Sequence, residues 1–233
     1  FADPTFQLVF KNTIEFTLAC LVVQFTIGFL FAMFFSKKFT LAGPIRGLVL
    51  VGYMMPMSVT ALLGKNLFLL DGGVINDLLM KVHLISSPID WLVNGGTALG
   101  AVIAVNCWVG IPFNMLLLTS GLTGISTDIY ESASMDGANA FKRFIYITLP
   151  LMKPAMLSVL MLGFIYTFKA FDLMYIMTAG GPFNSTDVLG TYAYSKAFTQ
   201  YEFSQGSAIA MVLFACLFLV GIFYLKLLSK EDD

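Results

Sequence analysis

Five long apolar segments dominate this sequence. They lie at about residues 13–35, 44–63, 97–120, 155–178 and 205–228. A helix needs roughly 20 apolar residues to cross about 30 Å of hydrocarbon, and each segment is long enough. Charged residues make up only 12% of the chain, about half the share usual in a soluble domain. We therefore expect an all-α fold, in which residues 1–233 form a single polytopic transmembrane helical bundle with five visible spans.

Composition also excludes several functional classes. A net charge of −1 argues against nucleic-acid binding through a basic surface. The only histidine is His83, so no zinc cluster or catalytic dyad built on histidines can form within the chain. Cys20, Cys107 and Cys216 each fall inside a predicted span, where they are expected to be small buried hydrophobic residues. We expect no metal site, no catalytic residue and no cofactor in this chain.

Two of the predicted spans contain a proline. Pro56 lies in the second segment and Pro112 in the third. A proline removes one helical hydrogen bond and kinks a helix, which membranes tolerate where neighbouring helices or a cavity satisfy the freed carbonyl. We expect kinks at both positions.

The distribution of basic residues predicts the orientation, because cytoplasmic loops of membrane proteins carry an excess of Lys and Arg. If the N-terminus lies outside, eight basic residues fall on the cytoplasmic side. They are Lys37, Lys38, Arg46, Lys142, Arg143, Lys153, Lys226 and Lys230. Four fall outside, namely Lys11, Lys65, Lys81 and Lys196. We therefore expect segment 121–154 and the C-terminus in the cytosol, and segments 64–96 and 179–204 outside.

The cytosolic segment 121–154 is polar and compatible with a helix. Asp128 and Glu131 have the spacing of a capping box, which predicts a short helix over about 129–142 with Asp128 as its N-cap. Small residues let a partner approach the backbone, and carboxylates can meet basic groups. These features predict a docking helix, although an ordinary amphipathic loop helix would share its composition.

The same segment carries a recognisable motif. Glu131-Ser-Ala-Ser-Met-Asp136-Gly137-Ala138 is followed by Phe144-Ile-Tyr-Ile147-Thr-Leu149-Pro150 and by Lys153-Pro154. This pattern resembles the EAA motif of binding-protein-dependent ABC importer permeases. The sugar-transporting, maltose-type branch is also resembled at Trp108-Val-Gly-Ile-Pro112, at Phe168-Lys-Ala-Phe171-Asp172 and at Gly180-Gly-Pro182, so the resemblance covers essentially the whole chain.

The resemblance implies a coupling role for this helix. In that family the EAA helix inserts into a cleft of a cytoplasmic ATPase subunit. The residues expected to make this contact are Glu131, Ala133, Asp136, Gly137 and Ala138. The chain has no Gly-x-x-x-x-Gly-Lys-[Ser/Thr] phosphate loop, so ATP and Mg²⁺ are expected on the partner ATPase. A stand-alone ion-coupled secondary transporter is the alternative, and it would need no such helix.

Polar residues inside the spans are the candidates for substrate contact, because they are costly in lipid. Asn106 and Gly110 stand four apart, and so do Gly163 and Thr167, which places each pair on one helical face. The resemblance to maltose-type permeases implies that all four line a sugar site. Tyr166 and Phe171 are expected to supply aromatic faces. Ordinary helix–helix packing is the alternative for the small residues.

Two charged residues also fall within the fourth segment. Lys169 and Asp172 are three apart, so on one helix they can pair. A structural ion pair is the simpler interpretation, and a proton relay is the alternative that a secondary transporter would require.

The family resemblance further implies a set of partners in a bacterial or archaeal plasma membrane. We expect a second, related permease subunit in a heterodimer, two cytoplasmic ATPase subunits, and an extracytoplasmic solute-binding protein at segments 64–96 and 179–204. The cargo is expected to be a di- or oligosaccharide. The chain begins at Phe1 rather than Met, and the odd number of spans predicts at least one further span upstream.

Overall fold

The computed structural model describes residues 3–37 and 39–229, and every regular element within these ranges is helical. The membrane-length helices are α1 (Pro4–Phe35), α5 (Ala98–Thr123), α8 (Leu149–Phe168) and α11 (Phe203–Ser229). The shorter elements are α2 (Ala42–Met54), α3 (Met57–Leu67), α4 (Val74–Lys81), α6 (Thr127–Met135), α7 (Ala140–Arg143), the π-helical turn η1 (Phe144–Thr148), α9 (Asp172–Met177), α10 (Leu189–Tyr194) and the π-helical turn η2 (Ser195–Thr199). The predicted all-α membrane bundle is confirmed.

Four helical stretches are long and apolar enough to cross a membrane, and the bent pair α2–α3 brings the number to as many as five. α1 begins at Pro4, well before residue 13, because Asp3 caps it: the Asp3 carboxylate accepts a hydrogen bond from the Thr5 N–H at 3.0 Å. α5 continues as one helix through Pro112, and the kink expected there stays a prediction.

The second segment is broken rather than kinked. α2 and α3 meet at an angle of 97°. Met55 is in the extended region, as residues before proline prefer, and Pro56 becomes the N-cap of α3. The fourth segment differs as well: a continuous helical stretch runs from Ala140 through η1 and α8 but ends at Phe168, short of the expected residue 178.

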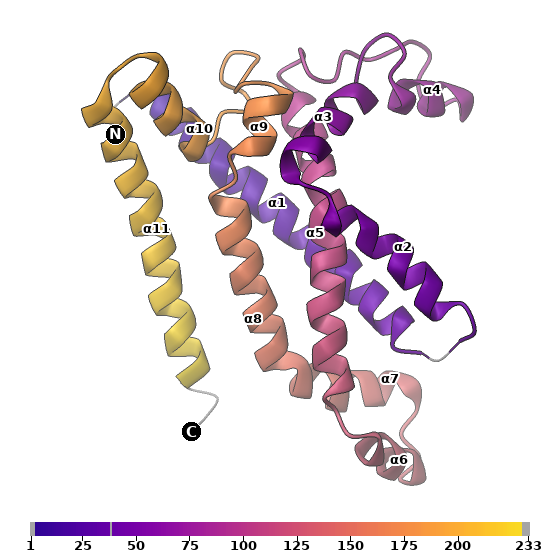
Figure 1. The fold of residues 1–233 in the computed structure, drawn as a ribbon. Coiled ribbons are helices and arrows are strands. Elements are labelled where there is room, and N and C mark those ends of the chain that lie inside the picture. Colours follow the sequence, from indigo (N-terminus) through magenta and orange to yellow (C-terminus); the bar gives the residue numbers. More distant parts are fainter. Residues whose placement is uncertain (1–2, 38, 230–233) are drawn as a thin grey trace.

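α1 is the central element of the bundle and crosses behind α5 and α8 (Figure 1). Gly28 on α1 permits a close approach to α5, since a Cβ at this position would lie 2.6 Å from the Asn114 Cβ. Near its N-terminus α1 also holds a distant loop. The Asn12 side chain donates to the Asn184 and Asp187 carbonyls, and the Thr13 hydroxyl accepts from the Leu189 N–H at 2.9 Å.

The small elements separate to opposite ends of the bundle. α6 and α7 lie at one end, with the end of α11, and α3, α4, α9 and α10 lie at the other, with the start of α1 (Figure 1). We call the first the coupling end and the second the outer end. The segments predicted to be cytoplasmic and external thus lie at opposite ends of the bundle (Figure 1), and which end faces the cytosol stays a prediction. Lys38 and Lys230, which the prediction counted, lie outside the described residues.

The buried Asn76 side chain connects several backbone segments at the outer end. Its side chain is 1% exposed, donates to the Leu69, Leu70 and Ile89 carbonyls, and accepts from the Ile89 N–H and from the Trp91 indole N–H at 2.8 Å. A buried amide that satisfies several backbone groups fixes the path of the chain around it.

Replacing Asn76 with Ala is expected to loosen this segment. The substitution removes five hydrogen bonds and leaves buried groups unpaired, which should cost about 2–4 kcal/mol of local stability. Hydrogen exchange over residues 68–97 measures this loss. Asn66→Ala is the matched control, because Asn66 is exposed and its side chain donates only to the Leu62 carbonyl within α3, so the protection of residues 68–97 should stay unchanged. Unchanged exchange in Asn76→Ala would show that the segment is held by other contacts.

Candidate coupling surface and substrate-contact residues

The docking segment at the coupling end is two helices joined by a turn. α6 is capped by Ser126, whose hydroxyl accepts from the Asp128 N–H at 3.3 Å, so the expected N-cap role of Asp128 is wrong. The single helix expected over 129–142 is also wrong. Gly137 has φ +80°, a left-handed conformation that glycine adopts without strain, and the chain turns there before α7. Asn139 caps α7 by accepting from the Lys142 N–H at 2.9 Å.

Two side-chain contacts tie α6 to the elements that follow it. The Tyr130 and Thr148 hydroxyls are 3.0 Å apart, which joins α6 to η1. The Arg143 guanidinium donates to the Ser134 hydroxyl at 2.8 Å, which joins α7 back to α6. Because η1 continues directly into α8, these contacts connect α6 to a membrane-length helix.

The predicted coupling residues lie on an exposed element. Glu131, Asp136 and Gly137 are exposed, whereas Ala133 and Ala138 are half-buried. No residue of α6 or α7 is fully buried. Two exposed apolar side chains were missed by the sequence reasoning: Met135 is 90% exposed and Phe141 is 70% exposed. The available signal was that both apolar residues fall within an otherwise polar segment.

The polar candidates in the bundle face α1. The Asn106 side chain is buried and donates to the Cys20 Sγ at 3.2 Å, while the backbone carbonyl of Asn106 accepts from the Gln24 side chain. A Cβ at Gly110 would collide with the Gln24 amide, so this glycine makes room for α1. The structure therefore places both residues in the contact between α1 and α5. Their predicted role in sugar binding stays a prediction.

Of the candidates in the fourth span, two are buried in the bundle and one is exposed. Gly163 and Thr167 are both buried, and a Cβ at Gly163 would lie 3.0 Å from Leu21 of α1. The Tyr166 residue, in contrast, is 56% exposed. The six predicted substrate residues are thus not one cluster in this structure.

Tyr166 ends a row of three aromatic rings that crosses three helices. Its ring centroid lies 5.7 Å from that of Phe113 on α5, and Phe113 lies 5.5 Å from Tyr53 on α2. Sequence reasoning missed Tyr53 and Phe113. Phe113 follows Gly110 by three residues, so helical spacing offered a signal for it, whereas Tyr53 joins the row only because α2 folds beside α5.

Phe171 belongs to a different aromatic cluster. It stacks on Tyr175 at 5.2 Å and touches Tyr194, which continues the cluster toward Phe198 and Phe203 at the outer end. The structure does not bring Phe171 into the row of Tyr53, Phe113 and Tyr166.

Lys169 and Asp172 do not share a helix, which corrects the expected pairing. Lys169 is the C-cap of α8, and Asp172 opens α9 after a break. Among residues 3–37 and 39–229 no ion pair joins them. The Lys169 ammonium lies 5.2 Å from the centroid of the Tyr166 ring, a distance typical of a cation–π contact.

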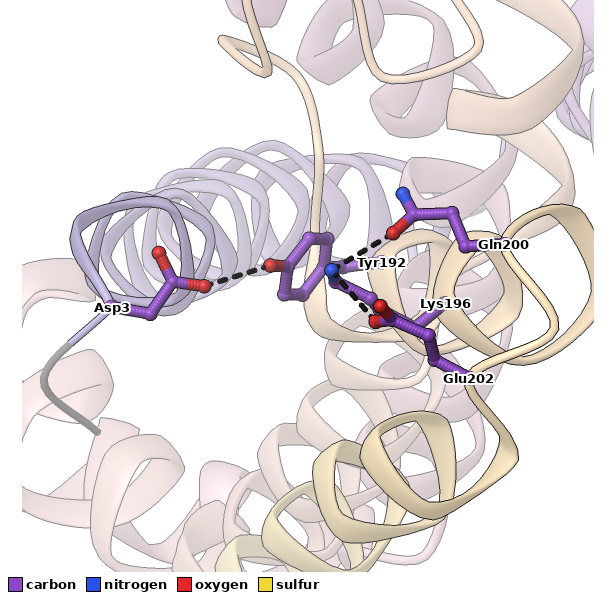
Figure 2. A network of polar contacts seen from close by, with 5 residues as sticks. All are labelled: Asp3, Tyr192, Lys196, Gln200 and Glu202. Carbon is purple, nitrogen blue, oxygen red and sulfur yellow. Dashed lines mark hydrogen bonds and ion pairs between the residues drawn. The ribbon is translucent and has the colours of Figure 1, made fainter.

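A polar network holds the start of α1 at the outer end (Figure 2). The Tyr192 hydroxyl donates to the Asp3 carboxylate at 3.1 Å, and Lys196 contacts Gln200 and Glu202 at 2.9 and 3.1 Å. Burial, followed by the bond to Asp3, raises the pKa of Tyr192 to about 12. Hydrogen bonds from Thr5 and Tyr192 lower the pKa of Asp3.

These shifts predict a pH dependence with a definite sign. The folded-state pKa of Tyr192 is raised above its ordinary value near 10, so its stabilisation is complete below pH 10 and is lost as the pH rises toward 12. Tyr192→Phe should remove this step from thermal-unfolding curves recorded between pH 9 and 12, while keeping the ring packed. An identical step in the variant would assign the transition to another group.

The geometry defines a class of protein: a polytopic helical membrane protein with the braced α6–α7 unit at one end and a hydrogen-bonded group of short helices at the other. The chain belongs to the family described as the binding-protein-dependent transport system inner membrane component, whose model matches residues 24–230. It is therefore an inner-membrane component of a transport system, which decides against the stand-alone carrier that the sequence left open.

Relatives and a solved structure agree with this assignment. The chain is 32% identical over 232 residues to the sulfoquinovosyl glycerol transport system permease protein SmoG of Agrobacterium fabrum, covering 100% of this chain and 75% of the relative. It is 31% identical over 214 residues to the trehalose/maltose transport system permease protein MalF of Thermococcus litoralis, covering 92% and 72%. The fold matches a bacterial ABC transporter involved in the import of the acidic polysaccharide alginate, with a TM-score of 0.88 and 19% identity, covering 99% and 81%.

Proposed function

We propose that this chain is the permease subunit of an ATP-driven, binding-protein-dependent importer of a di- or oligosaccharide, and that it forms half of the translocation pathway. Family membership supports the importer class. The carbohydrate class is supported by the names of the two permease relatives, both of which refer to sugars or a glycosyl glycerol.

The observation that carries the coupling half of the proposal is the construction of the α6–α7 unit. This unit is exposed at one end of the bundle, is braced by the Tyr130–Thr148 and Arg143–Ser134 contacts, and leads without interruption into α8. A mobile loop could bind a partner but could not transmit its movement. In our proposal a cytoplasmic ATPase subunit receives Glu131, Ala133, Asp136, Gly137 and Ala138 in a cleft, and it binds the ATP and Mg²⁺.

For the sugar, we propose that contact is made chiefly by the aromatic row in which exposed Tyr53 and Tyr166 flank half-buried Phe113. Aromatic faces pack against the apolar faces of sugar rings, and the two tyrosine hydroxyls can hydrogen-bond with sugar hydroxyls. Asn106, Gly110 and Gly163 lie against α1, and Thr167 is buried one helical turn from Gly163. These residues can join the site in a state in which α1 has moved relative to α5 and α8.

The remaining partners complete the transport cycle. A second, related permease would face this one across the pathway, two ATPase subunits would lie at the coupling end, and a loaded solute-binding protein would dock at the outer end. ATP-driven closure of the ATPases would move the two α6–α7 units together, so that the helices shift as rigid bodies and expose the site to each side in turn.

Reconstitution tests the proposal. The chain, purified with its second permease and ATPase, should hydrolyse ATP faster when its loaded binding protein is present. Proteoliposomes should accumulate the sugar only when ATP is supplied on the side of the membrane that carries the ATPase. Uptake driven by an ion gradient in the absence of any ATPase would overturn the proposal.

A further inference from the structure

An apolar cleft opens beside the start of α2. It measures about 400 Å³ and is formed by side chains of three helices, α1, α2 and α5. Its lining consists of Ile27, Phe31, Ile45, Leu48, Val49, Trp108, Ile111 and Pro112. Leu48 is 73% exposed and Trp108 is 64% exposed. An acyl chain suits such a cleft, because the side chains that line it are almost entirely apolar.

Basic side chains lie where this cleft reaches the coupling end. Arg46 directly follows the lining residue Ile45 in α2, and Lys37 lies just beyond the end of α1. The start of α2 is at the same end of the bundle as α6 and α7 (Figure 1). Arg46 is half-buried, yet among the described residues no carboxylate pairs with it or with Lys37.

The position of Arg46 near the N-terminal end of α2 gives its positive charge no favourable partner within the helix. The first turn of α2 carries no acidic residue, and Arg46 follows in the second turn. The N-terminal end of a helix is itself positive, so it favours an anion and disfavours a cation. Among the described residues, no carboxylate forms an ion pair that would balance the charge of Arg46.

We propose that this cleft binds one anionic phospholipid, with an acyl chain against Leu48, Trp108 and Ile111 and the headgroup phosphate against Arg46 and Lys37. Basic pockets between membrane helices on the cytoplasmic side are suited to anionic headgroups. The bound lipid would fix the junction between α1 and α2. This proposal does not depend on which sugar is carried or on how the ATPase docks.

Native mass spectrometry of the assembled transporter tests the site. The transporter is exchanged into equal amounts of phosphatidylglycerol and phosphatidylcholine with the same acyl chains. We expect one phosphatidylglycerol retained per copy of this chain, and about five-fold less retention in Arg46→Gln, which follows from one lost basic contact near the membrane surface. Leu48→Trp, which fills the cleft from an exposed position, should also lower retention.

Lys226→Gln is the matched control, because Lys226 is a basic residue at the same end of the bundle but on α11, which does not line the cleft. It should retain the lipid as the unsubstituted chain does. Equal retention of the two lipids, an equal loss in Lys226→Gln, or full competition by soluble glycerol phosphate would overturn the proposal. So would a photo-crosslinker at residue 48 that captures the second permease rather than lipid.

Discussion

Gly137→Val should reduce uptake to the background of membranes that lack the transporter, while the subunits still assemble. Gly137 has φ +80°, and a Cβ there would meet no other atom within 4 Å, so the problem is the backbone and not a collision. An L-residue in the left-handed region costs about 1–2 kcal/mol, and more if it is β-branched. The chain would relieve this strain by opening the turn, which would redirect α6 relative to α7.

The matched control for this prediction is Gly137→Asn, because asparagine tolerates the left-handed conformation better than other non-glycine residues. It should retain a substantial share of uptake although it places a larger side chain on the same exposed surface. ATP hydrolysis measured in parallel separates loss of coupling from loss of the ATPase. Equal failure of both variants would indicate that bulk at the docking surface matters rather than the direction of α6.

Tyr166→Ala should raise the half-saturating sugar concentration by about tenfold, as expected for the loss of roughly 1.4 kcal/mol of aromatic contact. Tyr166 is the most exposed ring of the row and borders Phe113, so its removal takes away one face of the proposed site. Tyr166→Phe is the control, since it keeps the ring, and the difference between the two variants measures the contribution of the face against that of the hydroxyl.

Asn106→Ala tests the buried part of the same site. If Asn106 joins the sugar in another state of the cycle, its loss should also weaken uptake, although by less than the loss of Tyr166 does. If it serves only the contact with Cys20 and Gln24, the variant should keep normal affinity and show reduced thermal stability. The pair of variants therefore separates sugar contact from helix packing.

The class of fold follows directly from apolar length, but the breaks within it do not. Hydropathy located all the long helices, because lipid imposes one length on every span. It could not distinguish the kink expected at Pro56 from the 97° bend that the structure contains, since both leave the same apolar composition. Nor did it separate α8 from α9, because residues 155–178 are apolar on both sides of Lys169.

The sequence located the candidate coupling residues better than it located the aromatic row, because only the coupling residues are neighbours along the chain. The predicted coupling residues lie close together in the sequence, so a motif could locate them, although the turn at Gly137 depends on a backbone torsion that the motif does not specify. The aromatic row is assembled from α2, α5 and α8, and only tertiary packing brings Tyr53 beside Phe113. Helical spacing groups residues on one helix, which is why it grouped Asn106 with Gly110 but could not say that both face α1.

Accessibility at the two ends of the bundle tests the central claim, that an ATPase acts through α6 while the opposite end faces the binding protein. Met135 is 90% exposed at the coupling end, and Phe183 is 96% exposed in the loop after α9. Each is replaced with cysteine and labelled in intact transporters with a membrane-impermeant maleimide. The account predicts that Met135→Cys reacts only from the cytosolic side and is protected when the ATPase binds, whereas Phe183→Cys reacts only from outside. Labelling of Met135→Cys that is unaffected by the ATPase, or that occurs from outside, would contradict it.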